Sequence, residues 1–229
     1  MIDIIRKAFF KLVKLNQVVD RAVRYRNPRK YWCERGGDPY FAEQEAVQHR
    51  ALRSQFIVDE IRKLEYDSLL EIGCGYGKQL KNLKRLSSTF IAGIDFSRSQ
   101  LLKAREVCFD VSPCLVEADA ESLPFKDKTF DVVLSSAVIL HNDYEKARRI
   151  LSEMIRVSRK YLIHNEDTDI TFSRYGYDMK KTYEKMGFRL VEWREIPFSP
   201  EPSKTQFTVV EITATKRTIE PEAIPLEYH

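Results

Sequence analysis

A glycine-rich loop after a short apolar run is the part of the chain best suited to bind a ligand. Residues 69–72 have the composition of a buried strand and continue into Gly-Cys-Gly-Tyr-Gly at 73–77. In open α/β sheets ligands bind at the carboxyl ends of strands, where glycine lets a ligand approach the backbone. The loop therefore predicts a nucleotide site that uses Gly73 and Gly75. Its third glycine comes one residue too early for the G-x-G-x-x-G of nicotinamide enzymes, which weakens a dehydrogenase interpretation.

Two acids follow the next two apolar runs, where an adenosine would meet them. Asp95 comes eighteen residues after Gly77, so its carboxylate is placed to accept hydrogen bonds from both ribose hydroxyls. Asp119 follows the third run, where it can accept from an adenine amino group while the amide of Ala120 meets a ring nitrogen. The alternative for each acid is a plain helix cap or turn residue. The spacing from the loop favours the ribose role for Asp95.

Short apolar runs alternate with helical segments around these residues. This alternation is typical of right-handed crossovers and a parallel sheet. Two final runs have no helix between them, so we expect them to pair as an antiparallel hairpin at one edge of the sheet. The runs expected to be parallel are Ser68–Ile72, Phe90–Ile94, Pro113–Val116, Phe130–Leu134 and Tyr161–His164, and the hairpin runs are Phe188–Trp193 and Phe207–Thr213.

The segments outside this alternation are expected to add an extension and a tail. Apolar residues recur at helical spacing over residues 2–23, and a second helical stretch is expected over 41–64. The first 35 residues hold ten Lys or Arg against three Asp or Glu. A basic amphipathic helix there either covers the core or attaches to an anionic membrane surface or an acidic partner. The expected units are a helical extension or lid (1–66), a core (67–217) and a loosely packed tail (218–229).

Composition limits the class of protein. A chain of 229 residues can form one α/β domain with a modest addition, and 31% charged residues are typical of a globular protein. The four cysteines and four histidines lack metal-ligand or disulfide spacing, so we expect no metal site and a reducing, cytoplasmic location. No apolar stretch reaches the roughly 18 residues of a membrane span. Charges within residues 1–10 argue against a signal peptide.

Taken together, these motifs resemble those of the class I S-adenosylmethionine-dependent methyltransferases, most closely the small-molecule group that includes the ubiquinone and menaquinone enzymes. The resemblance covers about residues 67–213 and is carried by five motifs in order. They are E-x-G-x-G-x-G at Glu71–Gly77, G-I-D-F-S at Gly93–Ser97, the acidic segment Glu117–Glu121 with Leu123-Pro124-Phe125, the segment Phe130–Ser136 with Leu140-His141, and the last helix with its G-F at Tyr177–Phe188.

The resemblance implies a Rossmann-like α/β fold with a doubly wound seven-stranded sheet in the order 3-2-1-4-5-7-6, strand seven being antiparallel. It implies S-adenosylmethionine as the cofactor and an O, N or C acceptor on a small molecule or lipid-like metabolite. Asp131 is expected to support the fold, and Glu71 to reach the methionine amino group. The residues implied to contact the cofactor are Glu71, Gly73, Cys74, Gly75, Asp95, Phe96, Asp119, Ala120, Ser135, Ser136 and Ala137, with the last three beneath the sulfonium.

Methyl transfer chiefly requires alignment of donor and acceptor and exclusion of water. His141 is the best placed general base for an amine or phenolate acceptor. The alternatives are a contact without proton transfer and a structural role. The N-terminal helices and the segment after the fifth strand are expected to close the acceptor pocket with aromatic side chains. These aromatic pieces are Tyr25, Tyr31-Trp32, Tyr40-Phe41 and Phe172–Tyr177.

Two other classes of function stay open. A nucleic-acid methyltransferase is favoured by the basic N-terminus and the net charge of +4. Against it, the chain has Ser-Ser-Ala-Val at 135–138 where enzymes that methylate base amino groups carry N-P-P-Y or D-P-P-Y. The other class is a non-catalytic module that binds the cofactor. The presence of both Asp95 and Asp119 argues against a decayed site.

Overall fold

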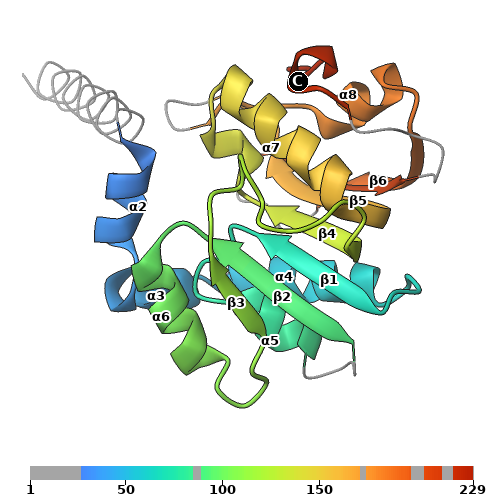
Figure 1. Ribbon diagram of the computed structural model, residues 1–229. Coiled ribbons are helices and arrows are strands. Elements are labelled where there is room, and N and C mark those ends of the chain that lie inside the picture. The colour runs from blue at the N-terminus through green and yellow to red at the C-terminus, as the bar shows by residue number, and fades with distance from the viewer. Residues whose placement is uncertain (1–26, 85–88, 171–173, 197–203, 213–218, 229) are drawn as a thin grey trace, which may run out of the picture.

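The computed structural model describes residues 27–84, 89–170, 174–196, 204–212 and 219–228. Its centre is a seven-stranded sheet in the order β3-β2-β1-β4-β5-β7-β6 (Figure 1). The strands are β1 (Ser68–Ile72), β2 (Phe90–Asp95), β3 (Cys114–Glu117), β4 (Phe130–Ser136), β5 (Ser158–Asp167), β6 (Arg189–Glu195) and β7 (Thr205–Glu211).

Helices precede, connect and follow these strands. The α-helices described are α2 (Pro28–Arg35), α3 (Asp38–Glu45), α4 (Gln48–Ile61), α5 (Lys78–Lys84), α6 (Arg98–Val107), α7 (Tyr144–Val157) and α8 (Met179–Lys185), and two short 3-10 helices are η1 (Ile139–His141) and η2 (Pro221–Ala223). Within the described ranges, no helix combines the length and the apolar character needed to cross a bilayer.

The pairing of the strands confirms the expected sheet. Strands β1 to β5 pair in parallel, while β7 runs antiparallel to both β5 and β6. The C-terminal hairpin therefore closes one edge of the sheet, as its two adjacent apolar runs predicted. All five parallel strands lie on the expected runs, and β5 is longer than predicted at both ends.

Alternation along the strands divides the core into two layers. Successive strand residues point to opposite faces of a sheet. Leu69 accordingly packs in a buried cluster with side chains of α4, α5 and α6, whereas Leu70 packs in a second cluster with α7 and α8. Figure 1 shows α7 lying across β4 and β5 on one face. This three-layer arrangement leaves the ends of the parallel strands free to carry a site.

The N-terminal part differs from the expected single helix. The stretch predicted over 41–64 is two helices, because Val47 adopts an extended backbone (φ −105°, ψ 103°) between α3 and α4. Apolar spacing did not reveal this break. A further helix, α2, begins at Pro28, where the Asn27 side chain accepts a hydrogen bond from the amide of Lys30 at 3.0 Å. The helix expected over residues 2–23 lies outside the described residues.

The C-terminal segment packs on the domain, so the expectation of a loose tail is wrong for residues 219–228. Ile224 and Leu226 are buried, with 1% and 3% of their surface exposed, in the layer that contains α7 and α8. Backbone carbonyls hold the segment in place, because Ser152 on α7 donates to the carbonyl of Ile219 at 2.6 Å. Prolines interrupt the sequence pattern here, which hides the two buried residues from an argument based on periodicity.

Candidate active site

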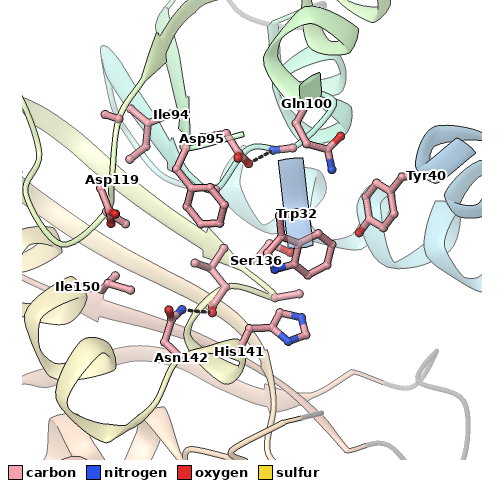
Figure 2. Close-up of a pocket in the computed structure, with 17 residues that line it drawn as sticks. Trp32, Tyr40, Ile94, Asp95, Gln100, Asp119, Ser136, His141, Asn142 and Ile150 are labelled. Atoms are coloured by element: carbon pink, nitrogen blue, oxygen red, sulfur yellow. Dashed lines mark hydrogen bonds between the residues drawn. The ribbon is translucent and has the colours of Figure 1, made fainter. Parts of the chain in front are cut away.

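The carboxyl ends of β1, β2 and β4 surround a continuous hollow. It consists of a cavity of about 170 Å³ beside Asp95 and Asp119, called the first cavity, and one of about 320 Å³ beside Arg50 and Arg53, called the second cavity. Both are lined by the same seven residues where they meet, which are Trp32, Tyr40, Gly73, Gly75, Ser136, Ala137 and His141. Figure 2 shows Asp119 at one end of the first cavity and Tyr40 with His141 toward the other.

The loop after β1 exposes its backbone to this hollow. Gly73 and Gly75 have φ values of +62° and +53°, a conformation that side chains with a Cβ rarely adopt. A Cβ on Gly73 would come within 2.6 Å of Val138 Cγ2, whereas one on Gly75 would meet open space with Gln100 at 3.9 Å. Gly73 is therefore required for packing of the loop, and Gly75 leaves the hollow open.

Asp95, at the end of β2, links the loops that follow β1 and β2. Its Oδ2 accepts a hydrogen bond from the amide of Gly75 at 2.9 Å, and its Oδ1 accepts one from the amide of Ser97 at 2.8 Å. Burial raises the pKa of Asp95 to about 6, while these two amides act in the opposite direction. The carboxylate both shapes the glycine loop and faces the first cavity.

The segment after β3 forms the far wall of the first cavity. Three of the residues expected to contact the cofactor, Phe96, Asp119 and Ala120, line it. The Asp119 carboxylate accepts a hydrogen bond from the amide of Glu121 at 3.1 Å and is otherwise exposed. Of the described residues that line this cavity, Asp95 and Asp119 are the two acids, and none is Lys or Arg.

The side chains of the two neighbouring serines at the end of β4 point to opposite sides of the strand. Ser136 and Ala137 line both cavities, and Ala137 has a φ of +57°, which is unusual for a residue with a Cβ. Ser135 is fully buried on the other side of the strand and donates to the Glu166 carboxylate at 2.5 Å. The expectation that the Ser135 side chain lies beneath the reacting centre is therefore wrong. Alternation along the strand turns it away.

Aromatic side chains from the N-terminal helices cover the hollow. Trp32 of α2 and Tyr40 of α3 line both cavities, and their ring centroids lie 5.6 Å apart. The Trp32 ring also lies 5.5 Å from the ring of His141, at the end of η1. Tyr177, from the other predicted aromatic cluster, is buried in the core instead. Tyr25 lies outside the described residues.

The second cavity is lined by the expected Glu71 and by two arginines, Arg50 and Arg53, that the sequence analysis missed. Arg50 Nη1 is buried and has no hydrogen-bond partner in the described part of the chain, and the same is true of Glu71 Oε2. Burial, followed by the nearby Asp95, raises the pKa of Glu71 well above its usual range. Arg50 and Arg53 lie three residues apart on α4. That spacing places both on one helix face and was the available signal.

Two more of the residues named with the family resemblance, Asp131 and Cys74, are buried. Asp131, at the start of β4, is fully buried and pairs with Arg159 at 2.7 Å, away from the carboxyl ends of the strands. Cys74 is largely buried but lines the second cavity, and burial raises the pKa of its thiol. Among the residues that the structure describes, no group of three His, Cys, Asp or Glu is placed to hold a metal ion.

The sheet order and the position of the glycine loop and two acids at its carboxyl edge define the class I methyltransferase fold. Residues 70–161 match the family model described as a methyltransferase domain. The chain therefore carries a class I S-adenosylmethionine-dependent methyltransferase domain, which over residues 70–161 is similar to that family.

Relatives with known names share this domain. Over 96 residues the chain is 38% identical to a phosphatidylethanolamine N-methyltransferase of Cereibacter sphaeroides. The matched segment covers 40% of this chain and 45% of the relative. Over 94 residues it is 37% identical to a phthiotriol/phenolphthiotriol dimycocerosates methyltransferase of Mycobacterium tuberculosis, covering 40% of this chain and 33% of the relative. The chain thus spans less than half the length of these curated relatives.

A solved structure agrees over more of the fold. The N-methyltransferase NodS of Bradyrhizobium japonicum, in complex with S-adenosylhomocysteine, superposes with a TM-score of 0.68 at 14% identity. The match covers 80% of this chain and 98% of NodS. At this low sequence identity the likeness shows a shared fold and nothing further.

Proposed function

We propose that this protein is an S-adenosylmethionine-dependent methyltransferase that acts on a small molecule or a lipid. The proposal is supported by the family match and by the two relatives named for lipid substrates. The observation that carries it is the composition of the hollow. Acids suited to an adenosine line one end. Beyond the glycine loop lie Arg50 and Glu71, each with a buried side-chain atom that has no hydrogen-bond partner among the described residues.

The first cavity fits the adenosine part of this cofactor. Asp95 would accept hydrogen bonds from the ribose hydroxyls, because one carboxylate can serve two donors. Asp119 would accept from the adenine amino group, with the amide of Ala120 donating to the ring. Phe96 lines the same wall and offers an apolar face to the base.

The second cavity fits the methionine part. A methionine moiety carries an ammonium and a carboxylate, and the cavity offers one acid and one base without partners in the described residues. Glu71 would hold the ammonium and Arg50 the carboxylate. Each pairing would give a hydrogen-bond partner to a buried polar atom, and leaving such an atom without a partner costs free energy. The Glu71 carboxyl would ionise as the ammonium approaches it, because a nearby positive charge offsets the desolvation that raises its pKa.

When bound, S-adenosylmethionine supplies an electrophilic methyl group. Three of the residues shared by both cavities, Ser136, Ala137 and His141, would then border the acceptor. His141 would take the proton that an amine or hydroxyl acceptor loses, or else contact the acceptor without proton transfer. Trp32 and Tyr40 would exclude water from the reacting atoms.

Calorimetric titration with S-adenosylhomocysteine tests the proposal. The wild-type protein should bind it, and Asp95→Ala should weaken binding at least about 100-fold, because two charge-assisted hydrogen bonds are lost. Asp59→Ala is the matched control, since this exposed acid on α4 pairs with Arg62 at 3.0 Å. Thermal melting checks that both variants fold. Wild-type affinity in Asp95→Ala would refute the assignment of the site.

A further inference from the structure

The two serines at the end of β4 meet different side chains of β5. Ser135 donates its hydroxyl hydrogen to the Glu166 carboxylate at 2.5 Å. Ser136 lies opposite Asn165 in the parallel ladder, and its oxygen accepts a hydrogen bond from the Asn165 side-chain amide at 2.8 Å. The carboxylate uses the hydrogen of Ser135, whereas the amide nitrogen is a donor and uses a lone pair of Ser136. The hydroxyl hydrogen of Ser136 is not used in this contact.

Arg53 fixes the orientation of the Asn165 amide. Its Nε lies 3.2 Å from Asn165 Oδ1, and its Nη2 lies 3.4 Å from the backbone carbonyl oxygen of the same residue. A guanidinium group has donors and no acceptor, so the amide oxygen faces Arg53 and the amide nitrogen faces Ser136. The reverse orientation would set two donors against each other. Asp167, at 3.4 Å, and the nearby Glu166 compensate the charge of Arg53, whose part here is to orient the amide.

Asn165 also holds the end of β4 through its backbone. It is fully buried, and its carbonyl oxygen accepts a hydrogen bond from the amide of Ala137 at 3.0 Å. Ser136 and Ala137 line both cavities. Within the described part of the chain, the bond from Asn165 is the one hydrogen bond of the Ser136 hydroxyl. Water can accept its hydrogen in the empty site, but a ligand that displaces this water must accept the hydrogen instead.

We propose that the Ser136 hydroxyl donates a hydrogen bond to the methyl acceptor, and that Asn165 is the positioning residue that keeps this hydrogen available. The acceptor is accordingly a hydroxyl compound and not an amine. The proposal rests on the proposed function, which places the reacting atoms beside Ser136.

The lone pairs of the acceptor atom decide between oxygen and nitrogen. The acceptor supplies one lone pair for the new bond to the methyl carbon, while the electron pair of the breaking carbon–sulfur bond stays on sulfur. A neutral amine nitrogen has no further lone pair, so it cannot accept the Ser136 hydrogen as it reacts. A hydroxyl that has passed its proton to His141 or to solvent keeps two further lone pairs and can accept it. A donor left without an acceptor in a closed site costs free energy, which disfavours the amine.

The test uses the full chain saturated with S-adenosylhomocysteine and two probes of similar shape. The probes are p-nitrophenol and p-nitroaniline, which present an oxygen or a nitrogen at the same position. Absorbance titrations at a series of pH values give the affinity of each probe and the pKa of the bound phenol. We expect saturable binding of the phenolate and a bound phenol that ionises at lower pH than the free one.

Removal of the hydroxyl should affect the oxygen probe alone. Ser136→Ala should weaken binding of p-nitrophenolate at least about tenfold, because a hydrogen bond to a charged group is lost. The pKa of the bound phenol should rise with it, and the affinity for p-nitroaniline should not change. Ser112→Ala is the matched control, since Ser112 lines neither cavity and its hydroxyl donates to the carbonyl of Phe109.

The positioning role of Asn165 is tested through Ser136. Asn165→Asp gives Ser136 a carboxylate like the one that faces Ser135, so the hydroxyl should turn away from the cavity and p-nitrophenolate should bind at least about tenfold more weakly. The new charge could also repel the probe, so the same substitution is made in Ser136→Ala. There it should have no further effect. A loss that persists there would overturn the positioning role. If melting shows that Asn165→Asp does not fold, Asn165→Leu takes its place, with the same expectations.

The outcomes separate this proposal from the proposed function. Three results would overturn the hydroxyl acceptor and leave the cofactor assignment intact: no saturable binding of p-nitrophenolate, equal phenolate affinity in Ser136→Ala and Ser112→Ala, or an equal loss for both probes in Ser136→Ala. A loss of affinity for S-adenosylhomocysteine in Ser136→Ala that exceeds the loss for the phenolate would assign the hydroxyl to the cofactor instead. Failure of S-adenosylhomocysteine to bind the wild-type protein would overturn the proposed function, and this proposal with it.

Discussion

At the scale of single residues, Asp95 gives cofactor binding a pH dependence. Its pKa of about 6 reflects burial, and the ribose hydroxyls would donate to the ionised form. Below pH 6 the carboxyl group is protonated in the free protein, so binding must expel a proton and affinity falls. The Asp95 contribution should raise the dissociation constant for S-adenosylhomocysteine about tenfold between pH 7 and pH 5, in addition to the contribution of Glu71, which also ionises on binding. Calorimetry across that range measures the total, and Asp95→Asn should remove the tenfold part. Equal wild-type affinity at both pH values would contradict the role.

Sequence patterns predicted some of the residues of the candidate site and not others. Asp95 and Asp119 were predictable, because an acid at or just after the end of a strand lies at the carboxyl edge of the sheet. Arg50 and Arg53 were not, since basic residues on a helix usually mark a solvated face. Ser135 was placed wrongly because a motif names neighbouring residues together, whereas the pleat of a strand sends them to opposite sides.

At the scale of elements, the start of α6 holds the end of α2 over the site. Ser97 donates to the carbonyl of Trp32 at 3.1 Å, and Ser99 donates to the carbonyl of Cys33 at 2.8 Å. Because the amide of Ser97 also donates to Asp95, the ribose acceptor and the aromatic cover share one support. The placement of α2 should therefore depend on these serine hydroxyls.

We predict that Ser99→Ala weakens binding of S-adenosylhomocysteine about fivefold, the value of one net hydrogen bond of about 1 kcal/mol. The change in Trp32 fluorescence on binding should shrink as well, measured in a Trp193→Phe background because the chain has two tryptophans. Ser112→Ala, beyond the other end of α6, is the control, since Ser112 bonds only locally to the carbonyl of Phe109. If both variants bind like wild type, α2 does not depend on this support.

Strands and helices differed in how well the sequence predicted them. Strands are short runs rich in apolar residues between turns, so all seven were located, and their order followed from the resemblance. The N-terminal helices were less predictable. Their boundaries depend on local backbone geometry at Asn27 and Val47, and apolar spacing does not encode that geometry.

At the scale of the whole molecule, the site is built from one edge of the sheet and closed by segments distant in sequence. Helices α2 to α4 precede the sheet and supply Trp32, Tyr40 and three of the four arginines of the second cavity. The C-terminal segment lies instead on the layer of α7 and α8 (Figure 1). We therefore expect the two ends of the described chain to contribute differently, the first to ligand binding and the second to stability.

Leu226 tests this division. Truncation of a buried leucine leaves a cavity, so Leu226→Ala should lower the free energy of unfolding by about 2–4 kcal/mol. Urea unfolding measures the change, and Glu222→Ala, at an exposed position of η2, is the control that should stay near wild type. Affinity for S-adenosylhomocysteine, measured well below the melting temperature, should remain within twofold, because Leu226 lines neither cavity. A variant as stable as Glu222→Ala would mean that the segment adds little to the core, and a stable variant with weakened binding would place it in the site instead.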